Sequence, residues 1–105
     1  MVKDIYPAKI HFTDEAGAKI RPVLLIRKNS FGDYVFLPFT TNLKTKGIVI
    51  ETTDTECGSL QKKSIVVTEK ISVISPLLLL RKIASIKDNS FKRIVDSVSD
   101  FIQGK

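Results

Sequence analysis

The segments KIRPVLLI, residues 19–26, and LPFTTN, residues 37–42, decide how this chain folds. Each joins an apolar run to polar groups at one end, with Arg21 in the first segment and Thr40 in the second. The residues after Pro22 are too uniformly apolar to alternate, which is typical of a strand buried on both faces. Pro22 is tolerated at the first position of such a strand, and it holds Arg21 extended. The two segments therefore predict two rigid strands, each with a polar side chain at its end.

Short β segments continue on both sides of this pair. Turn-forming residues at 29–33 separate the two strands, so an antiparallel hairpin is expected. Pro7 should restrict the first strand to a sheet edge or a bulge. The region 52–58 is typical of a turn. The expected strands cover residues 5–10, 21–27, 34–39, 48–50, 64–67, 71–74 and 81–86.

The end of the chain has a different period. Apolar residues recur there at three- and four-residue spacing, which predicts an amphipathic helix; they are Phe91, Ile94, Val95, Val98, Phe101 and Ile102. Asp88 or a close neighbour is the expected N-cap, and Gly104 lies just past the end. The predicted class is mainly β with a C-terminal α-helix, in which a small curved antiparallel sheet is closed by the helix.

Length and charge set the scale of the molecule. A chain of 105 residues is expected to form a single domain, residues 1–105. Seventeen Lys and Arg against eleven Asp and Glu give a formal net charge of +6. This surplus suits a polyanionic partner, either nucleic acid or an acidic protein segment, although a solvated basic surface needs no partner.

Cysteine usage and hydropathy indicate the compartment. Cys57 is the only cysteine, which fits a reducing environment. The start of the chain shows no apolar signal core, and the run at 76–80 is far too short to span a membrane. A cytoplasmic location without membrane association is expected.

Two polar side chains could meet a phosphate. An extended Arg21 presents a planar fork of donors, but it could equally pair with Asp14 or Glu15 in the preceding turn. The hydroxyls of Thr40 and Thr41 could donate to a phosphoryl oxygen, but threonine is common in strands and turns for structural reasons. The residues alone leave both alternatives open.

A basic polar loop follows the second segment. Lys44 and Lys46 suit backbone phosphates, and the amide of Asn42 could read a base edge. Phe12 is a candidate for stacking on unpaired bases, whereas Tyr6 is expected in the core.

The sequence lacks the residue patterns of metal sites, nucleotide-binding loops and esterases. His11 is the only histidine, and no zinc or cluster spacing accompanies it. The residue could act as a general base at neutral pH. No phosphate-binding glycine loop and no nucleophile elbow occur, which disfavours nucleotide hydrolysis, dinucleotide chemistry and esterase activity.

KIRPVL and LPFTTN resemble the two signature stretches of the PemK/MazF family, the toxins of bacterial toxin–antitoxin pairs. The resemblance spans nearly the whole chain and implies an SH3-like, CcdB/PemK-like barrel. It also implies catalytic roles for Arg21 and Thr40. The RNA-binding residues it suggests, together with the loop chemistry above, are Phe12, Lys19, Thr41, Asn42, Lys44, Lys46 and Lys70.

Two positions depart from the family pattern. Lys3 stands where an opening glycine is usual, and Pro7 where a hydrophobic or aromatic residue is common. Glu15 lies in a first loop where some members have a functional acidic residue, but the loop length differs.

The resemblance further implies a sequence-specific endoribonuclease that cleaves single-stranded mRNA and inhibits translation. Attack by the ribose 2′-hydroxyl would give a 2′,3′-cyclic phosphate without a metal or other cofactor. The expected partners are RNA, an acidic antitoxin and a second copy of the chain as a homodimer. The alternative is a non-catalytic SH3-like binding module or a topoisomerase-inhibiting toxin, since one scaffold hosts several functions.

Overall fold

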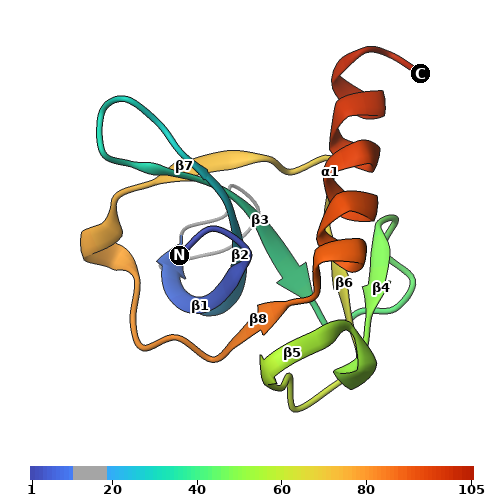
Figure 1. Ribbon diagram of the computed structural model, residues 1–105, viewed down its shortest axis with the longest axis horizontal. Helices are drawn as coiled ribbons and strands as arrows, with labels where there is room; N and C mark the ends of the chain where they lie inside the picture. Colours follow the sequence, from blue (N-terminus) through green and yellow to red (C-terminus); the bar gives the residue numbers. More distant parts are fainter. Residues whose placement is uncertain (11–18) are drawn as a thin grey trace.

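Eight strands form one curled antiparallel sheet within residues 1–10 and 19–105, the part of the chain that the computed structural model describes (Figure 1). The strands are β1 (Asp4–Ile10), β2 (Lys19–Lys28), β3 (Tyr34–Thr40), β4 (Ile48–Ile50), β5 (Thr55–Gly58), β6 (Ser64–Val66), β7 (Ser72–Ile74) and β8 (Ala84–Ile86). Two 3₁₀ turns, η1 (Thr52–Asp54) and η2 (Pro76–Leu78), and the helix α1 (Asp88–Ile102) complete the fold. The predicted class, mainly β with a C-terminal helix, is confirmed.

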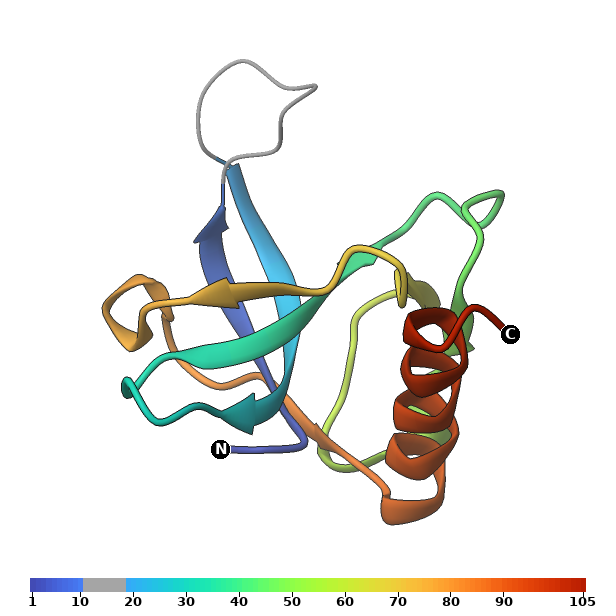
Figure 2. The same ribbon diagram turned by 90° about the horizontal axis from the view of Figure 1, so that it is seen from above.

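The three long strands β1, β2 and β3 lie at the centre of the sheet. The strand order is β4-β6-β3-β2-β1-β8-β5, and β7 pairs separately with β3. β3 pairs with β2 along one edge, and its other edge is divided between β7 at its start and β6 at its end. This division bends the sheet, and Figure 2 shows α1 standing beside the end that carries β4 and β6.

Two apolar clusters stabilise the sheet, one on each face. The larger one lies between the sheet and α1, where Leu24, Leu37 and Ile94 are completely buried. The second cluster contains Val23, Leu25 and Tyr6 and includes Ile74 of β7. Both faces of β2 are covered, which is the physical reason that its apolar run does not alternate.

The helix begins as predicted, with an N-cap within one residue of Asp88. Lys87 is the N-cap and makes no side-chain cap bond, whereas Asp88 is the first helical residue. Ile94 and Val98 are buried as the apolar period predicts. Phe101 and Ile102, in the last turn of the helix, are exposed. No helix among the described residues combines the length and apolar character that crossing a membrane requires.

The expected positions of two prolines were wrong. β1 is an interior strand, and Pro7 lies opposite Pro22, which is the fourth residue of β2 and not its first. The N–H and carbonyl of a strand residue point to the same side, and the Pro7 carbonyl faces away from β2, so the missing N–H of Pro7 costs no ladder bond to β2. On that side the pairing of β1 with β8 ends at Ile5, and the Pro7 carbonyl accepts a hydrogen bond from the Leu80 N–H at 2.8 Å.

The segment 55–58 is a strand, β5, where the sequence predicts a turn. It pairs with β8 through a register shift, and Gly58 adopts a φ of +72° at its end. A Cβ at Gly58 would overlap the carbonyl oxygen of Ile83. The strand depends on this close approach to β8, which is distant in sequence. The predicted strand at 81–86 is correspondingly shorter, covering only Ala84–Ile86.

Lys3 occupies a backbone conformation that favours glycine. Its φ is +74°. Its N–H donates to the Leu25 carbonyl at 2.9 Å, and its carbonyl accepts from the Ile86 N–H at 2.9 Å. The left-handed conformation costs a non-glycine residue roughly 1–2 kcal/mol. A glycine, which is usual at this position in the family that the sequence resembles, would avoid this cost. Here the Lys3 ammonium contacts the carboxylates of Glu56 and Asp88 instead.

Asp4 predicts how the fold responds to acid. Burial by itself raises the pKa of this carboxyl, but the Ser85 hydroxyl donates to it at 2.6 Å, and the N-terminal ammonium and Lys82 lie 3.4 and 3.5 Å away. Together these groups lower the pKa of Asp4 below its ordinary value of 3.8. A carboxyl with a depressed folded-state pKa stabilises the fold above the unfolded value, and that stabilisation is lost as pH falls through the folded value.

We therefore expect the melting temperature to decrease at pH values below about 4. At pH 7, Asp4→Asn should be less stable than wild type. The difference in melting temperature between wild type and Asp4→Asn should narrow as pH falls below 3.8, because protonation removes the carboxylate charge that the substitution also removes. Thermal melts from pH 2 to 8 measure this, with exposed Asp100→Asn as the control. A gap that is constant over this range would contradict the assignment.

Candidate active site

The candidate site lies where β2 and β3 separate. Their last paired residues at this end are Val23 and Pro38. Arg21 and Thr40 each lie two residues beyond that pair, on neighbouring strands. Side chains alternate between the faces of a sheet, so both belong to the face of Val23 and Pro38. Both are half-buried, which leaves part of each accessible to solvent.

Arg21 is held by β1 on its other side. It lies opposite Ala8 in the β1–β2 ladder, and Pro22 follows it. Its Nε atom is buried, so the stem and the base of the guanidinium lie within the protein. A guanidinium anchored in this way loses less conformational entropy when it binds an anion than a free surface side chain would.

Hydrogen bonds within the loop fix Thr40 and Asn42. The Thr40 hydroxyl oxygen accepts a bond from the Asn42 N–H at 3.2 Å, and Asn42 Oδ1 accepts one from the Lys44 N–H at 3.1 Å. The Asn42 carbonyl also accepts from Thr45 at 3.0 Å. Because the Thr40 hydroxyl oxygen acts as an acceptor here, its hydrogen can still be directed to a ligand. Asn42 likewise keeps its side-chain NH₂ for donation.

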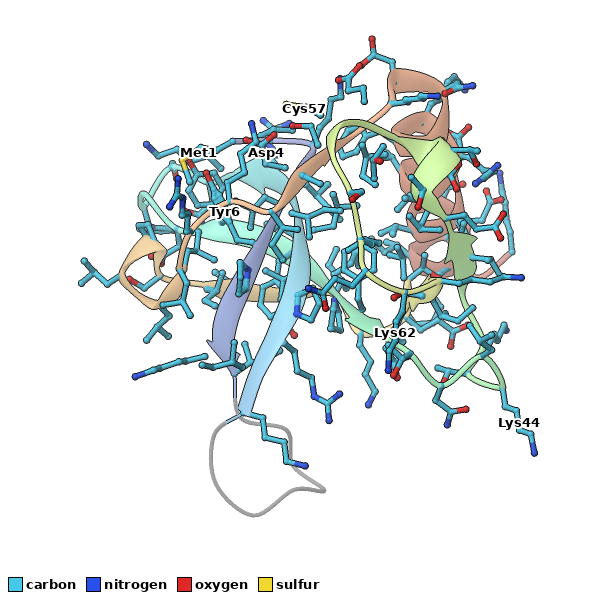
Figure 3. All side chains as sticks on the ribbon, turned by 90° about the horizontal axis from the view of Figure 1, so that it is seen from below. Met1, Asp4, Tyr6, Lys44, Cys57 and Lys62 are labelled. Carbon is cyan, nitrogen blue, oxygen red and sulfur yellow. The ribbon has the colours of Figure 1, made fainter. Side chains whose placement is uncertain are left out.

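The predicted cations lie at different places around the site. Lys44 is exposed and extends outward from its loop (Figure 3), and Lys19 is exposed at the start of β2. Thr41 and Asn42 are exposed beside Thr40, and Lys70 is exposed between β6 and β7. Phe12, His11 and Glu15 lie outside the described residues.

Lys46 lies beside an acidic residue at the helix side of the loop. Its ammonium lies 2.9 Å from a carboxylate oxygen of Glu69. Lys46 and Glu69 also line a groove of about 840 Å³ against α1, together with Arg93 and Asp96. The fold therefore places Lys46 toward the helix, and its charge is already balanced in part.

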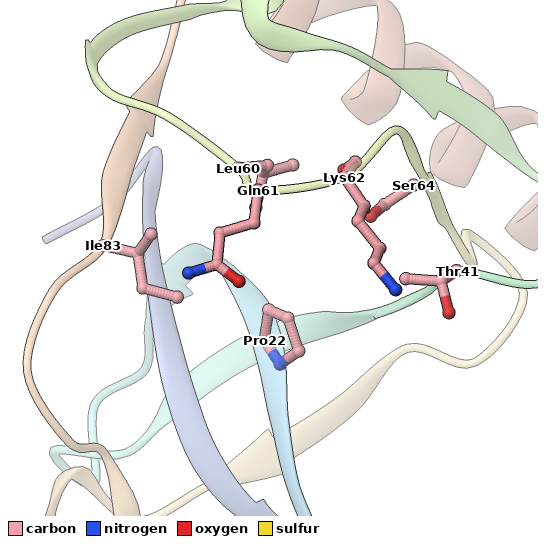
Figure 4. A pocket seen from close by; sticks show the side chains of 7 residues that line it. All are labelled: Pro22, Thr41, Leu60, Gln61, Lys62, Ser64 and Ile83. Atoms are coloured by element: carbon pink, nitrogen blue, oxygen red, sulfur yellow. The ribbon is translucent and has the colours of Figure 1, made fainter.

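Sequence reasoning missed the polar residues of the β5–β6 loop. Gln61 and Lys62 line a pocket of about 340 Å³ that Pro22 and Thr41 also line (Figure 4). No local pattern marks 61–62 as part of a site. The loop reaches the strand ends only because β6 pairs with the end of β3.

These features define a small curled-sheet protein with a cationic loop and a polar site at the separation of two strands. The family model described as PemK-like, MazF-like toxin of type II toxin–antitoxin system matches residues 3–102. The chain therefore belongs to this family of toxins. A comparison with curated protein sequences returned no match.

The fold has a counterpart among solved structures. The Mycobacterium tuberculosis toxin MazF-mt6 is similar with a TM-score of 0.66 and 19% sequence identity, and the match covers 92% of each chain. At this identity the likeness shows a shared fold. The predicted SH3-like, CcdB/PemK-like architecture is confirmed.

Proposed function

We propose that this toxin is a sequence-specific endoribonuclease that cleaves single-stranded mRNA and thereby inhibits translation. The observation that carries the proposal is the equivalent placement of Arg21 and Thr40, two residues past the last β2–β3 pair, on one face and open to solvent. A rigid cation and a hydroxyl on neighbouring strands can bind the same phosphodiester. Family membership independently supports a toxin that acts on RNA.

The reaction uses a nucleophile that belongs to the substrate. The ribose 2′-hydroxyl loses its proton and bonds to the adjacent phosphorus, while the bond from phosphorus to the 5′-oxygen breaks and that oxygen gains a proton. The products are a 2′,3′-cyclic phosphate and a 5′-hydroxyl. The protein has to align the attacking and leaving oxygens and to stabilise the charge that grows on the phosphoryl oxygens.

Arg21 and Thr40 divide this work. The guanidinium of Arg21 offers a planar set of donors to two phosphoryl oxygens, and its buried Nε end restricts its motion. The Thr40 hydroxyl donates to one of these oxygens while the Asn42 N–H holds it in place. Donors positioned before the reaction stabilise the transition state without reorganisation at the moment of reaction.

The surrounding polar residues bind the RNA chain. Lys19 and Lys44 are exposed and suit neighbouring phosphates, and the NH₂ of Asn42 suits a base edge. Lys46 contributes less in this arrangement, because RNA must compete with Glu69 for its ammonium. Phe12 and Lys70 remain proposed RNA contacts.

Incubation with mixed-sequence RNA in the presence of a chelator tests the proposal. We expect cuts at a limited set of sequences, with cyclic phosphate on the upstream fragment and a free 5′-hydroxyl on the downstream fragment. Intact RNA across many sequences would overturn the nuclease assignment. It would favour a non-catalytic module or a topoisomerase inhibitor on the same scaffold.

Thr40→Val removes the hydroxyl with little change in side-chain shape. Loss of one positioned donor is expected to reduce the cleavage rate by about 10²-fold. Thr40→Ser should retain most activity because it keeps the hydroxyl. Thr45→Val, in the same loop, is the control for loop perturbation. Single-turnover cleavage of a fixed oligonucleotide measures all three, and a Thr40→Val rate equal to wild type would remove Thr40 from the site.

The family implies an antitoxin partner, and the net charge of +6 favours an acidic one. We propose that an acidic antitoxin segment covers the strand ends and the 41–46 loop, because the same cations would bind its carboxylates. Antitoxin and RNA should therefore compete for this toxin.

We also propose that the toxin acts as a homodimer. Phe31, Val73 and Leu77 are highly exposed apolar residues in the 29–33 turn, β7 and η2, which lie at one end of the molecule (Figures 1 and 2). Burial of these side chains against a second copy would remove apolar surface from water. Light scattering at micromolar concentration should give the mass of two chains, and a single-chain mass would contradict the dimer.

A further inference from the structure

The pocket between the β5–β6 loop and the ends of β2 and β3 opens on the helix-side face of the sheet. Pro22, which lines it, shares a face of β2 with Leu24 of the cluster beneath α1, because side chains alternate along a strand. Arg21 shares the other face with Val23 of the second cluster, and Thr40 belongs to that face too. The pocket therefore lies on the face opposite the candidate active site and has no role in the reaction described above.

The pocket has apolar walls and two polar side chains in different parts of it. The walls come from Pro22, Leu60 and Ile83. In Figure 4 the Gln61 amide lies between Pro22 and Ile83. The Lys62 ammonium lies beside Thr41 in the same view. The volume is about 340 Å³, at the lower end of the range of about 300–1,000 Å³ that is usual for ligand pockets. A pocket of this size and composition suits one large apolar side chain with a charged group beside it.

An apolar strip continues from the pocket along the β1–β2 hairpin. Two cross-strand pairs on the helix-side face form it, Pro7 with Pro22 and Lys9 with Ile20. Ile20 is 58% exposed, although it is a large apolar residue within a strand. Successive side chains on one face of a strand lie about 6.4–6.8 Å apart. An extended peptide has the same spacing, so it can follow the strip with one side chain in the pocket.

The charges beside the pocket and the strip favour an acidic occupant. Lys62 and Lys9 are exposed, and neither forms an ion pair within the part of the chain that the structure describes. The next residue, Lys63, lies 3.6 Å from Glu51 instead. Two such cations at the borders of an apolar surface attract a segment that carries carboxylates next to apolar residues.

Other occupants suit this surface less well. The chain's own C-terminal residue, Lys105, lines the separate groove beside Lys46. The proposed dimer surface is built from other residues, namely Phe31, Val73 and Leu77, and a second copy would bring a further net charge of +6. RNA held for cleavage lies on the opposite face of the sheet.

The loop that carries Gln61 and Lys62 is anchored on both sides. Leu60 is 8% exposed and belongs to the core cluster beneath the helix. Ser64 is 4% exposed, and its hydroxyl donates to the Lys62 carbonyl at 3.0 Å. The positions of Gln61 and Lys62 are therefore set before any ligand arrives, which reduces the entropic cost of binding.

We infer that this pocket anchors one large apolar side chain of an acidic antitoxin segment, with a neighbouring carboxylate on Lys62. The inference rests on the proposed antitoxin and adds its point of attachment. Thr41 lines the pocket and follows Thr40, so a segment that covers the 41–46 loop reaches the helix-side face past this residue. The Gln61 amide offers two donors and an acceptor to the backbone of the segment. Only the part of the segment on the 41–46 loop competes with RNA, and the anchored part does not.

The test uses a short capped peptide of Asp and Glu with one central Leu, and a matched peptide with Ala in its place. Methyl NMR spectra of the full chain follow each titration. We expect the Leu60, Ile83 and Ile20 methyl signals to shift, whereas those of Leu25 and Ile74, on the other face, stay unchanged. Burial of a leucine side chain corresponds to roughly 10- to 150-fold in affinity. The pocket is open on one side, so the Ala peptide should bind about 10-fold more weakly. Equal affinity of the two peptides would overturn the inference.

Lys62→Glu tests the charged part of the anchor. Reversing one exposed charge replaces an attraction with a repulsion, so the Leu peptide should bind roughly 2- to 30-fold more weakly. Lys28→Glu, at the exposed far end of β2, changes the net charge equally and should stay within about twofold of wild type at physiological salt. Thermal melts check that both variants fold. Equal losses in the two variants would show that only net charge attracts the peptide, which contradicts an anchor at Lys62.

A titration in the presence of a bound 2′-deoxy oligonucleotide distinguishes this inference from the proposed function. The oligonucleotide lacks the attacking hydroxyl, so it binds without being cut. Peptide affinity should change by less than about twofold at physiological salt, because the two ligands lie on opposite faces. If the oligonucleotide displaces the peptide, or itself shifts the Leu60 and Ile83 signals, the anchor is wrong.

The two proposals can also fail separately. If the Leu peptide shifts the Leu60 and Ile83 signals but ribose RNA is never cut, the nuclease fails and the anchor stands. If ribose RNA is cut and the peptide leaves these signals unchanged, the nuclease stands and the anchor fails.

Discussion

Arg21→Ala is expected to reduce RNA cleavage by about 10²–10³-fold or more, because it removes the donors that stabilise charge on the phosphoryl oxygens. Single-turnover rates on a fixed oligonucleotide measure the effect. The fold should be retained, since Arg21 lies past the last β2–β3 pair and outside both apolar clusters. Circular dichroism and a thermal melt of the same sample check this point.

Arg21→Lys is the matched variant. It keeps the positive charge but replaces the planar fork with a single ammonium, so it should recover RNA binding more fully than the cleavage rate. A cleavage rate equal to wild type in Arg21→Ala would show that the guanidinium takes no part in the reaction. Equal rates for Arg21→Lys and wild type would show that only charge matters at this position.

Gly47→Ala is expected to destabilise the fold strongly. A Cβ at this position would overlap the carbonyl oxygen of Val66 and the Cγ2 atom of Ile65, so the loop after Asn42 could not return against β6. Overpacking of this kind costs roughly 1–3 kcal/mol. A cost of 2 kcal/mol would lower the melting temperature by about 8–16 °C at this chain length. Activity should also fall at temperatures where the fold persists, because the same loop carries the residues beside Thr40.

Gly32→Ala is the control that separates the steric overlap at position 47 from the loss of glycine's backbone freedom. Gly32 has a φ of +85° and open space where a Cβ would lie, so its replacement costs only backbone strain of about 1 kcal/mol. Urea titrations of both variants give the free energies of unfolding. If the two variants lose equal stability, the close approach of Gly47 to β6 is not important.

Local patterns in the sequence predicted most of the elements. The uniform apolar run after Pro22 indicated a strand covered on both faces, and both apolar clusters include residues of β2. The period of 3.6 residues in the last segment indicated α1, whose Ile94 is fully buried. Such patterns are readable because the burial of one face imposes the spacing of the element on the sequence.

Elements without a local pattern were missed or misplaced. β5 is a short polar strand that exists because Gly58 lets it approach β8, which lies far along the chain. Pro7 does not require an edge here because its missing N–H faces the side of β1 where the pairing with β8 has already ended. Both depend on the partner across the sheet.

The candidate site also combines features that the sequence predicts with features that only the tertiary structure shows. The sequence by itself placed Arg21 just before one apolar β run and Thr40 just after another; in the structure Arg21 is the third residue of β2 and Thr40 is the last residue of β3. Only the tertiary structure placed them at equal distance past one β2–β3 pair, turned Lys46 toward Glu69, and brought Gln61 and Lys62 to the strand ends. Spacing along the chain encodes which face of an element is buried. Which elements meet is decided by the pairing of strands that are distant in sequence, and a local pattern does not carry that information.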